Sequence, residues 1–117
     1  MAEPISSLAS LVKAHLTDRE RDGAVAYAIQ TCVPAGTSLV LSGITIQVTK
    51  DAYVVFVDRD PLANWSHASR YLLIERDGGG VQSFEAQFPP FPQQDKGRWH
   101  VVHRAPSVPD SALMIPP

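Results

Sequence analysis

The first part of the chain carries apolar residues at helical spacing. They recur every three or four positions between residues 5 and 16, with polar residues between them, and this period predicts an amphipathic helix. Thr17, with Glu20 three positions later, has the spacing of a capping box, which starts a second helix or continues the first. The short, alanine-rich segment 24–29 favours helix as well, with a strand as the alternative. The apolar stripe of the first helix consists of Ile5, Leu8, Leu11, Val12 and Leu16.

The pattern changes to strands after the breaker at Pro34. Residues 38–41 form a short β-like run, and residues 44–48 alternate between apolar and polar, which predicts a half-buried strand. Lys50 and Asp51 are expected to form a hairpin turn into the next run. That run, residues 53–57, is apolar without alternation and therefore predicts a central strand covered on both faces.

The second half of the chain also contains apolar runs that predict strands. Residues 71–74 are again continuously apolar, and the glycine-rich turn at 77–80 leads into a predicted strand over 81–88. A final short strand is expected at 99–103. The proline-rich segment 106–117 predicts an extended or mobile tail.

Together these elements predict an α+β fold in which N-terminal helical segments pack on a mostly antiparallel sheet, a meander of about four to six strands. Residues 1–105 are expected to form one domain, followed by the tail at 106–117. One helical layer covers one face of a sheet, whereas the two continuous apolar runs need cover on both. Either the segment 24–29 and the proline-rich loops cover the second face, or another protein does. We predict a partner chain or a homodimer there.

Composition narrows the function classes. The chain has 117 residues, of which 44% are hydrophobic and 19% charged, which fits one folded domain and not a disordered chain. Ten Lys and Arg against twelve Asp and Glu give a net charge of −2, so no nucleic-acid partner is expected. The single cysteine excludes an intramolecular disulfide. No apolar run is long enough for a membrane span, so we expect no membrane partner and a cytoplasmic protein.

Asp58 and Asp60 follow the apolar run 53–57 as an Asp-x-Asp pair. Over six residues this resembles the first motif of haloacid-dehalogenase-type phosphatases. The resemblance implies a nucleophile at Asp58, an acid/base at Asp60 and magnesium held by both. The following Pro61 and Leu62 depart from the residues usual in that family, and no parallel strand–helix series follows. Acidic residues at a strand end are also typical of a solvated loop entrance or an Asx turn.

The loop between the two apolar strands, residues 59–70, is long for a hairpin, and long ordered loops often carry function. An indole beside an amide, an imidazole and charged groups can recognise a polar ligand or a peptide. The alternative is a loop whose Trp65 packs on the sheet. The predicted binding residues are Asp60, Asn64, Trp65, His67 and Arg70.

Cys32 with His67 and either Asn64 or Asp60 supplies the residue types of a thiol hydrolase. A lone cysteine after an apolar stretch is more commonly a small buried side chain. His100 and His103 are three apart, which in a regular strand places them on opposite faces. We therefore expect no metal site and no cofactor.

The sequence thus favours a non-enzymatic interaction protein that binds a partner chain or itself through its sheet, with the 59–70 loop contributing recognition. The alternative is a small hydrolase that uses Asp58 and Asp60 with a metal, or Cys32 and His67 as a thiol pair.

Overall fold

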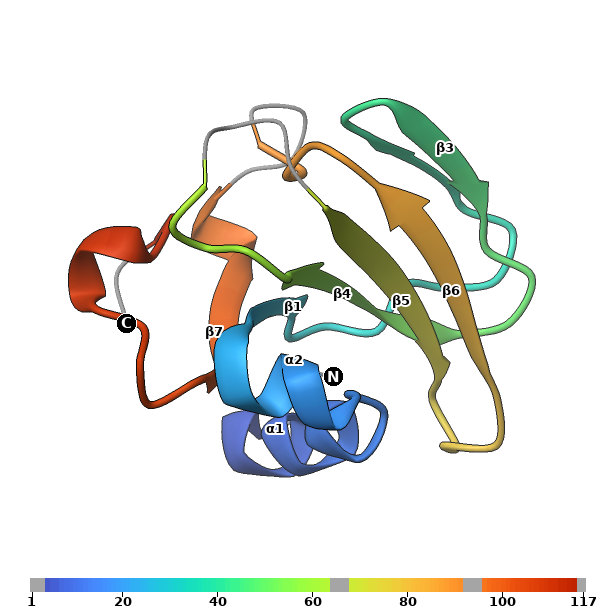
Figure 1. Cartoon of the computed structure of the whole chain (residues 1–117). Helices are drawn as coiled ribbons and strands as arrows, with labels where there is room; N and C mark the ends of the chain where they lie inside the picture. The colour runs from blue at the N-terminus through green and yellow to red at the C-terminus, as the bar shows by residue number, and fades with distance from the viewer. Residues whose placement is uncertain (1–3, 64–67, 92–95, 116–117) are drawn as a thin grey trace.

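The α+β fold is confirmed: two N-terminal helices pack on an antiparallel five-stranded sheet of order β6-β5-β4-β1-β7, beside a separate two-stranded sheet, β2-β3 (Figure 1). A computed structural model describes residues 4–63, 68–91 and 96–115. None of the helices in these ranges is long and apolar enough to cross a membrane. The elements are α1 (Ile5–Ala14), α2 (Asp18–Gly23), β1 (Val25–Ile29), β2 (Ser38–Leu41), β3 (Ile44–Gln47), β4 (Ala52–Asp58), β5 (Ser69–Glu75), β6 (Val81–Ala86) and β7 (Trp99–Arg104), with short 3-10 turns η1 (Lys96–Arg98) and η2 (Asp110–Ala112).

The two predicted helices form as the pattern indicates. α1 buries Leu8 and Val12 against the sheet. The capping box is present: Glu20 N–H donates to Thr17 Oγ1 at 3.1 Å, and Thr17 N–H donates to Glu20 Oε1 at 2.9 Å. These two bonds satisfy backbone N–H groups that the start of a helix otherwise leaves without an acceptor, and α2 therefore begins at Asp18.

The helix predicted over 24–29 is wrong, because these residues form β1, a central strand between β4 and β7. Every residue of β1 is buried. Ala26 and Ala28 face the helices, where their small size lets α1 approach, whereas Tyr27 and Ile29 face the other side. The helical preference of alanine amounts to only a few tenths of a kcal/mol per residue. Burial and two ladders of hydrogen bonds outweigh it.

Two connections also differ from the prediction. Lys50 and Asp51 do not form a hairpin turn, because β3 pairs only with β2 and the chain passes here from the small sheet to the large one. β7 pairs with β1 and not with its predecessor β6. Only β4, β5 and β6 therefore form a meander, and residues distant in sequence close the sheet at β1 and β7.

The second face of the sheet is covered by the chain itself. On what we call the helix face, α1 covers alternate residues of β1, β4 and β5. On the opposite hairpin face, the β2–β3 hairpin, Phe91 and the segment after Ala105 complete a second core. Val55 and Phe56, on opposite faces of β4, are both fully buried. The apolar sheet thus needs no partner protein to cover it, which corrects the reason for predicting one.

The segment after Ala105 belongs to this second core as far as the structure describes it. Val108 and Ile115 are buried, and the Met114 N–H donates to the Tyr27 hydroxyl at 3.0 Å. The expectation of a separate extended tail is therefore corrected up to Ile115. Proline-rich sequence indicated an extended backbone, but it did not indicate that the apolar residues between the prolines have a place on the sheet.

Candidate functional site

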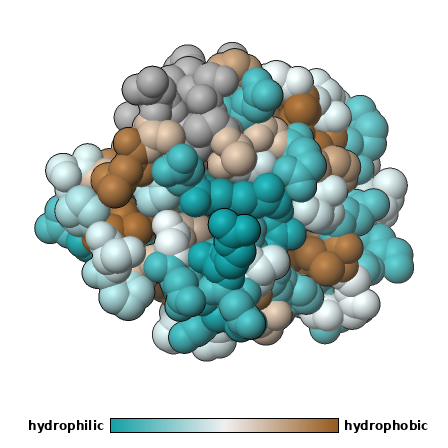
Figure 2. Space-filling view, viewed as in Figure 1, coloured by the Kyte–Doolittle hydropathy of each residue, from teal (hydrophilic) through white to brown (hydrophobic). Residues whose placement is uncertain are grey.

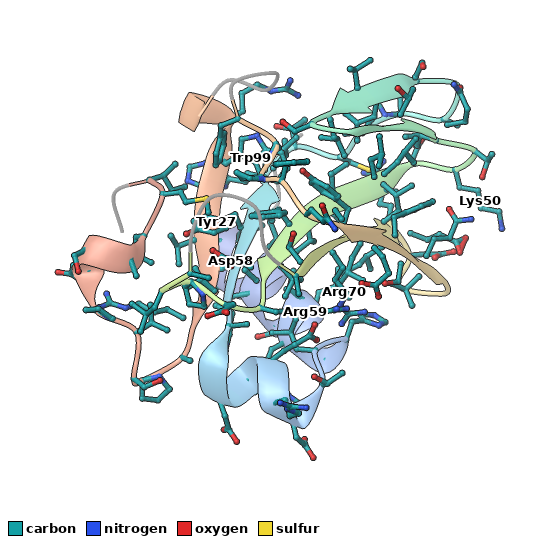
Figure 3. All side chains as sticks on the ribbon, turned by 45° about the horizontal axis from the view of Figure 1, so that its top comes forward. Tyr27, Lys50, Asp58, Arg59, Arg70 and Trp99 are labelled. Atoms are coloured by element: carbon teal, nitrogen blue, oxygen red, sulfur yellow. The ribbon has the colours of Figure 1, made fainter. Side chains whose placement is uncertain are left out.

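A buried carboxylate lies where the helices meet the end of β4 and the start of β5. Glu20, whose side chain is only 5% exposed, accepts hydrogen bonds from Arg70 Nε at 2.8 Å and Arg70 Nη2 at 2.6 Å. Arg59 Nε donates to the same carboxylate at 3.1 Å. Arg59 and Arg70 lie next to one another in Figure 3. Paired arginines that satisfy both oxygens make this a strong, charge-assisted arrangement.

The same arginines extend the network across three strands and both helices. Arg70 also donates to the His15 carbonyl at 3.1 Å and to Ser83 Oγ at 3.2 Å. Arg59 forms a two-pronged ion pair with Glu85 on β6, at 3.0 and 3.2 Å. The network therefore ties the α1–α2 corner to β4, β5 and β6 and holds this end of the molecule in one geometry.

The environment of Glu20 favours its charged form. Burial by itself raises the pKa of a carboxyl group, but the hydrogen bonds from Arg70, the Thr17 N–H and Arg59, with the charge of Arg70, outweigh it. The pKa of Glu20 is consequently below its usual value of 4.5. The carboxylate is thus a permanent anion at neutral pH, and its role is to hold the arginines.

A cleft of about 620 Å³ opens beside this network, at the start of the 59–70 loop. Most of its lining residues are polar or charged, and Figure 2 shows a continuous hydrophilic band across the middle of the face that carries the helices. The cleft is lined by Thr17, Arg19, Glu20, Gly23, Arg59, Asp60 and Ala68.

Of the predicted binding residues, Asp60 lines this cleft, and Arg70 lies behind it with its side chain committed to Glu20, His15 and Ser83. Asn64, Trp65 and His67 lie outside the described residues. Sequence reasoning missed Arg59 and Glu85, and it identified Glu20 only as a helix cap. No local sequence pattern predicts that these residues contact one another, because they are far apart in the chain.

The Asp-x-Asp pair is an Asx turn. The side chain of Asp58 is fully buried, and its Oδ1 accepts the Asp60 N–H at 3.1 Å. β4 pairs antiparallel with both neighbours, whereas the phosphatase resemblance implies a parallel sheet. Asp60 is exposed and directed to the cleft side.

Cys32 lies at the other end of the molecule from Asp58. Its neighbour Val33 bridges to Ala52, at the start of β4, whereas Asp58 ends that strand. Six residues of extended strand separate these ends by about 20 Å. Burial raises the pKa of the Cys32 thiol, and the charge of Asp51 raises it further. The thiol is therefore not activated toward a thiolate nucleophile.

The prediction that His100 and His103 lie on opposite faces is wrong. β7 contains a bulge opposite Ala26 and Tyr27, so His100 pairs with Ala28 and His103 with Ala26, both on the helix face. His103 Nε2 lies 3.0 Å from the Arg21 carbonyl. Among the described residues no three His, Cys, Asp or Glu side chains are grouped so that they could hold a metal ion.

The described part of the site thus gathers charges that satisfy one another, beside a polar cleft. It does not place a nucleophile next to a base within the ranges described, which is the arrangement that covalent catalysis needs. Comparison with the models of known protein families, with curated proteins and with solved structures finds no match for this chain.

Proposed function

We propose that this chain is a non-catalytic binding protein that pairs with an extended segment of a partner protein along β6, with the 59–70 loop and its cleft contributing specificity. The observation that carries the proposal is the open edge of β6 next to a rigid polar cleft. The partner thus lies beside the sheet, and not on either of its covered faces.

The backbone of β6 supports strand addition. Glu75 N–H donates to the Gly80 carbonyl at 2.9 Å, and antiparallel pairs alternate along the ladder from there. By this alternation Val81, Ser83 and Glu85 direct their N–H and C=O groups away from β5. These outward groups are a template for another strand.

β6 also carries little of the usual protection of an edge, because its one charged residue, Glu85, is paired with Arg59. It contains neither lysine nor proline, and its register with β5 is regular over all its residues. Val81 is 44% exposed. The opposite edge strand, β7, is bulged, which is a common way to discourage pairing.

The cleft adjoins this edge through an ion pair. Glu85 of β6 holds Arg59, whose side chain forms part of the cleft wall. A strand added to β6 would therefore run toward the cleft, so that one end of the bound segment reaches Arg19 and Asp60. Polar walls fixed by the Glu20 network favour a polar residue there, since little ordering is needed on binding.

A foreign segment fits this edge better than a second copy. When two β6 strands pair antiparallel about Ser83, each Val81 lies opposite the Glu85 of the other strand, and an apolar side chain opposite a carboxylate stabilises a ladder poorly. Cytoplasmic location and the hydrolase alternative stay predictions. The hydrolase is less well supported, because Asp58 Oδ1 accepts the Asp60 N–H in an Asx turn and burial raises the pKa of the Cys32 thiol.

The test begins with peptides selected from a random library on the immobilised protein. We expect bound peptides to slow amide hydrogen exchange at Val81, Ser83 and Glu85. Val81→Lys should weaken the binding of these peptides at least tenfold, because it places a charge on the edge. Val40→Lys is the matched control, because Val40 is an exposed valine on β2 (53%). The affinity of Val40→Lys for the selected peptides should be unchanged.

Light scattering on a sizing column at two protein concentrations tests the choice of partner. A monomer at both concentrations is expected. A concentration-dependent dimer that Val81→Lys dissociates would overturn the foreign segment in favour of a second copy. Selected peptides that leave the β6 amides unprotected, or that bind both valine variants equally, would overturn strand addition.

A further inference from the structure

The two sides of the β6 edge differ in chemistry. Successive side chains of a strand point to opposite faces of its sheet. Ser83 pairs with Leu72, which belongs to the core on the helix face. Phe84 pairs with Tyr71, which belongs to the core on the hairpin face. The helix side of β6 therefore carries Val81, Ser83 and Glu85, and the hairpin side carries Gln82, Phe84 and Ala86.

The helix side of β6 is open to solvent and mostly polar. Among the described residues, the core beneath α1 includes none from β6. Ser83 Oγ accepts a hydrogen bond from Arg70 Nη1 at 3.2 Å, and the exposed side chain of Glu85 holds Arg59. Val81, at the end of β6 away from the cleft, is the one apolar residue on this side. An apolar partner residue gains little here, because it buries little surface.

The hairpin side of β6 carries an apolar surface near the cleft end of the strand. Phe84 and Ala86 pack against the hairpin-face core but are only half-buried, so part of each stays uncovered. The β2–β3 turn lies next to this surface, because a Cβ atom built on Gly43 would lie 3.6 Å from Phe88 Cδ2 (Figure 1). Gln82, toward the other end, is polar and exposed. The uncovered apolar surface thus spans two alternate positions of β6.

The hydrogen-bond alternation brings a partner side chain closest to β6 on the hairpin side. Phe84 and Ala86 direct their backbone groups to β5, so an antiparallel strand added to β6 faces them in non-hydrogen-bonded pairs. Facing Cα atoms in such pairs are about 4.5 Å apart, against about 5.5 Å in hydrogen-bonded pairs. An aromatic ring that faces a β-branched or aromatic side chain stabilises a ladder. The strongest side-chain contact with an added strand is therefore expected at Phe84.

From this asymmetry we infer that the partner segment is amphipathic and runs antiparallel to β6. It carries β-branched or aromatic residues opposite Phe84 and Ala86, with polar residues at the other positions. Its apolar side covers the exposed part of Phe84 beside the β2–β3 hairpin, and its polar side faces solvent next to Ser83 and Glu85. In this direction the N-terminal end of the segment reaches the cleft. The inference rests on the proposed strand addition and specifies the kind of sequence that binds there.

Two peptides of the same composition test the pattern. In acetyl-Val-Thr-Ile-Thr-Ser-Thr-amide the valine and isoleucine share one side of an extended chain, so they can lie opposite Ala86 and Phe84. In acetyl-Thr-Val-Ile-Thr-Ser-Thr-amide they are adjacent, so one of them points to the helix side in any register. Titration of isotope-labelled protein, followed by the amide NMR signals of β6, measures both affinities. We expect the second peptide to bind at least threefold more weakly than the first.

A spin label on either end of the first peptide tests the direction. A label on the N-terminal end should broaden the amide signals of Arg59 and Asp60. A label on the C-terminal end should instead broaden those of Gly80 and Val81. The reverse result would overturn the antiparallel direction.

Variants on the two sides of β6 complete the test. Phe84→Thr should weaken the first peptide at least tenfold and remove its advantage over the second. Val81→Thr is the matched control on the helix side, and it should preserve both the affinity and the advantage. Because Phe84 also packs on the core, the unchanged chain provides a second measurement. Nuclear Overhauser effects are expected there between the isoleucine methyl groups of the peptide and the Phe84 ring.

The outcomes separate this inference from strand addition itself. The amphipathic pattern is overturned if both peptides bind equally, if folded Phe84→Thr retains full affinity, or if the isoleucine contacts Val81 and Ser83 instead of Phe84. It is also overturned if library peptides protect the β6 amides but show no alternation of apolar residues, and strand addition then stands. Library peptides that leave these amides unprotected would overturn both.

Discussion

Truncation of the chain after Ala105 is expected to lower the free energy of unfolding by about 5 kcal/mol. It removes Val108 and Ile115, which are 4% and 6% exposed, and burial of each aliphatic side chain contributes roughly 1.5–3 kcal/mol. It also removes the Met114 N–H that donates to Tyr27, a bond of about 1 kcal/mol. Urea unfolding followed by circular dichroism measures the difference. A loss of this size is a large share of the stability of a small domain.

Single substitutions test the same claim in a chain that still folds. Ile115→Ala should cost about 2–3 kcal/mol, because it leaves a cavity against the hairpin-face core. Ser111→Ala is the control, because Ser111 is exposed in the same segment, and its effect should stay within about 0.5 kcal/mol. A truncated chain that unfolds at the same urea concentration as the full chain would show that the segment adds nothing to the core.

Glu20→Ala is expected to cost about 3 kcal/mol at neutral pH. The substitution leaves the guanidinium of Arg70, only 12% exposed, without its carboxylate, and removal of one partner of a buried ion pair is strongly destabilising. It also removes the acceptor of the Thr17 N–H in the capping box. Glu85→Ala is the matched control in the same network. Glu85 is 76% exposed, so its loss should change the unfolding free energy by less than about 1 kcal/mol. Equal losses for the two variants would contradict a central role for Glu20.

The contribution of Glu20 should depend on pH in one direction. Its pKa in the folded chain is below the usual 4.5, so the folded state binds its proton less readily than the unfolded state. The stabilisation is therefore complete above about pH 4.5 and is lost as the pH falls through the lower folded pKa. We expect the difference in unfolding free energy between the full chain and Glu20→Gln to shrink over that acidic range. A difference that stays constant down to pH 2 would exclude this linkage.

Prediction from the sequence succeeded where a pattern depends on neighbouring residues and failed where it depends on distant ones. The capping box at Thr17 and Glu20 formed as expected, because both ends of the motif lie within one turn. The strand β1 was mistaken for a helix because its alanines report a local preference, whereas its pairing with β4 and β7 decides its structure. His100 and His103 share a face only because of a bulge, which the strand pattern did not reveal.

The candidate site shows the same division. Asp60 and the long loop were identifiable, since an acidic residue after an apolar strand marks a loop entrance. The contacts of Arg59 and Arg70 with Glu20 join residues 39 and 50 positions apart, and no spacing rule links positions at such separations. Lys50 and Glu75 likewise meet only because the β4–β5 ladder pairs Ala52 with Glu75.

By itself, the sequence determined that the chain has an amphipathic helix at its start, continuous apolar strands at its centre and a tight glycine turn between β5 and β6. Hydrophobic period, capping and turn chemistry act over a few residues, so they can be recognised from the sequence alone. Only the tertiary structure decided which strands are neighbours, that the β2–β3 hairpin and the C-terminal segment cover the second face, and that β6 is left as the open edge. These outcomes depend on which apolar surfaces of the whole chain fit together best. No short stretch of sequence reveals which of the alternative packings is the most stable.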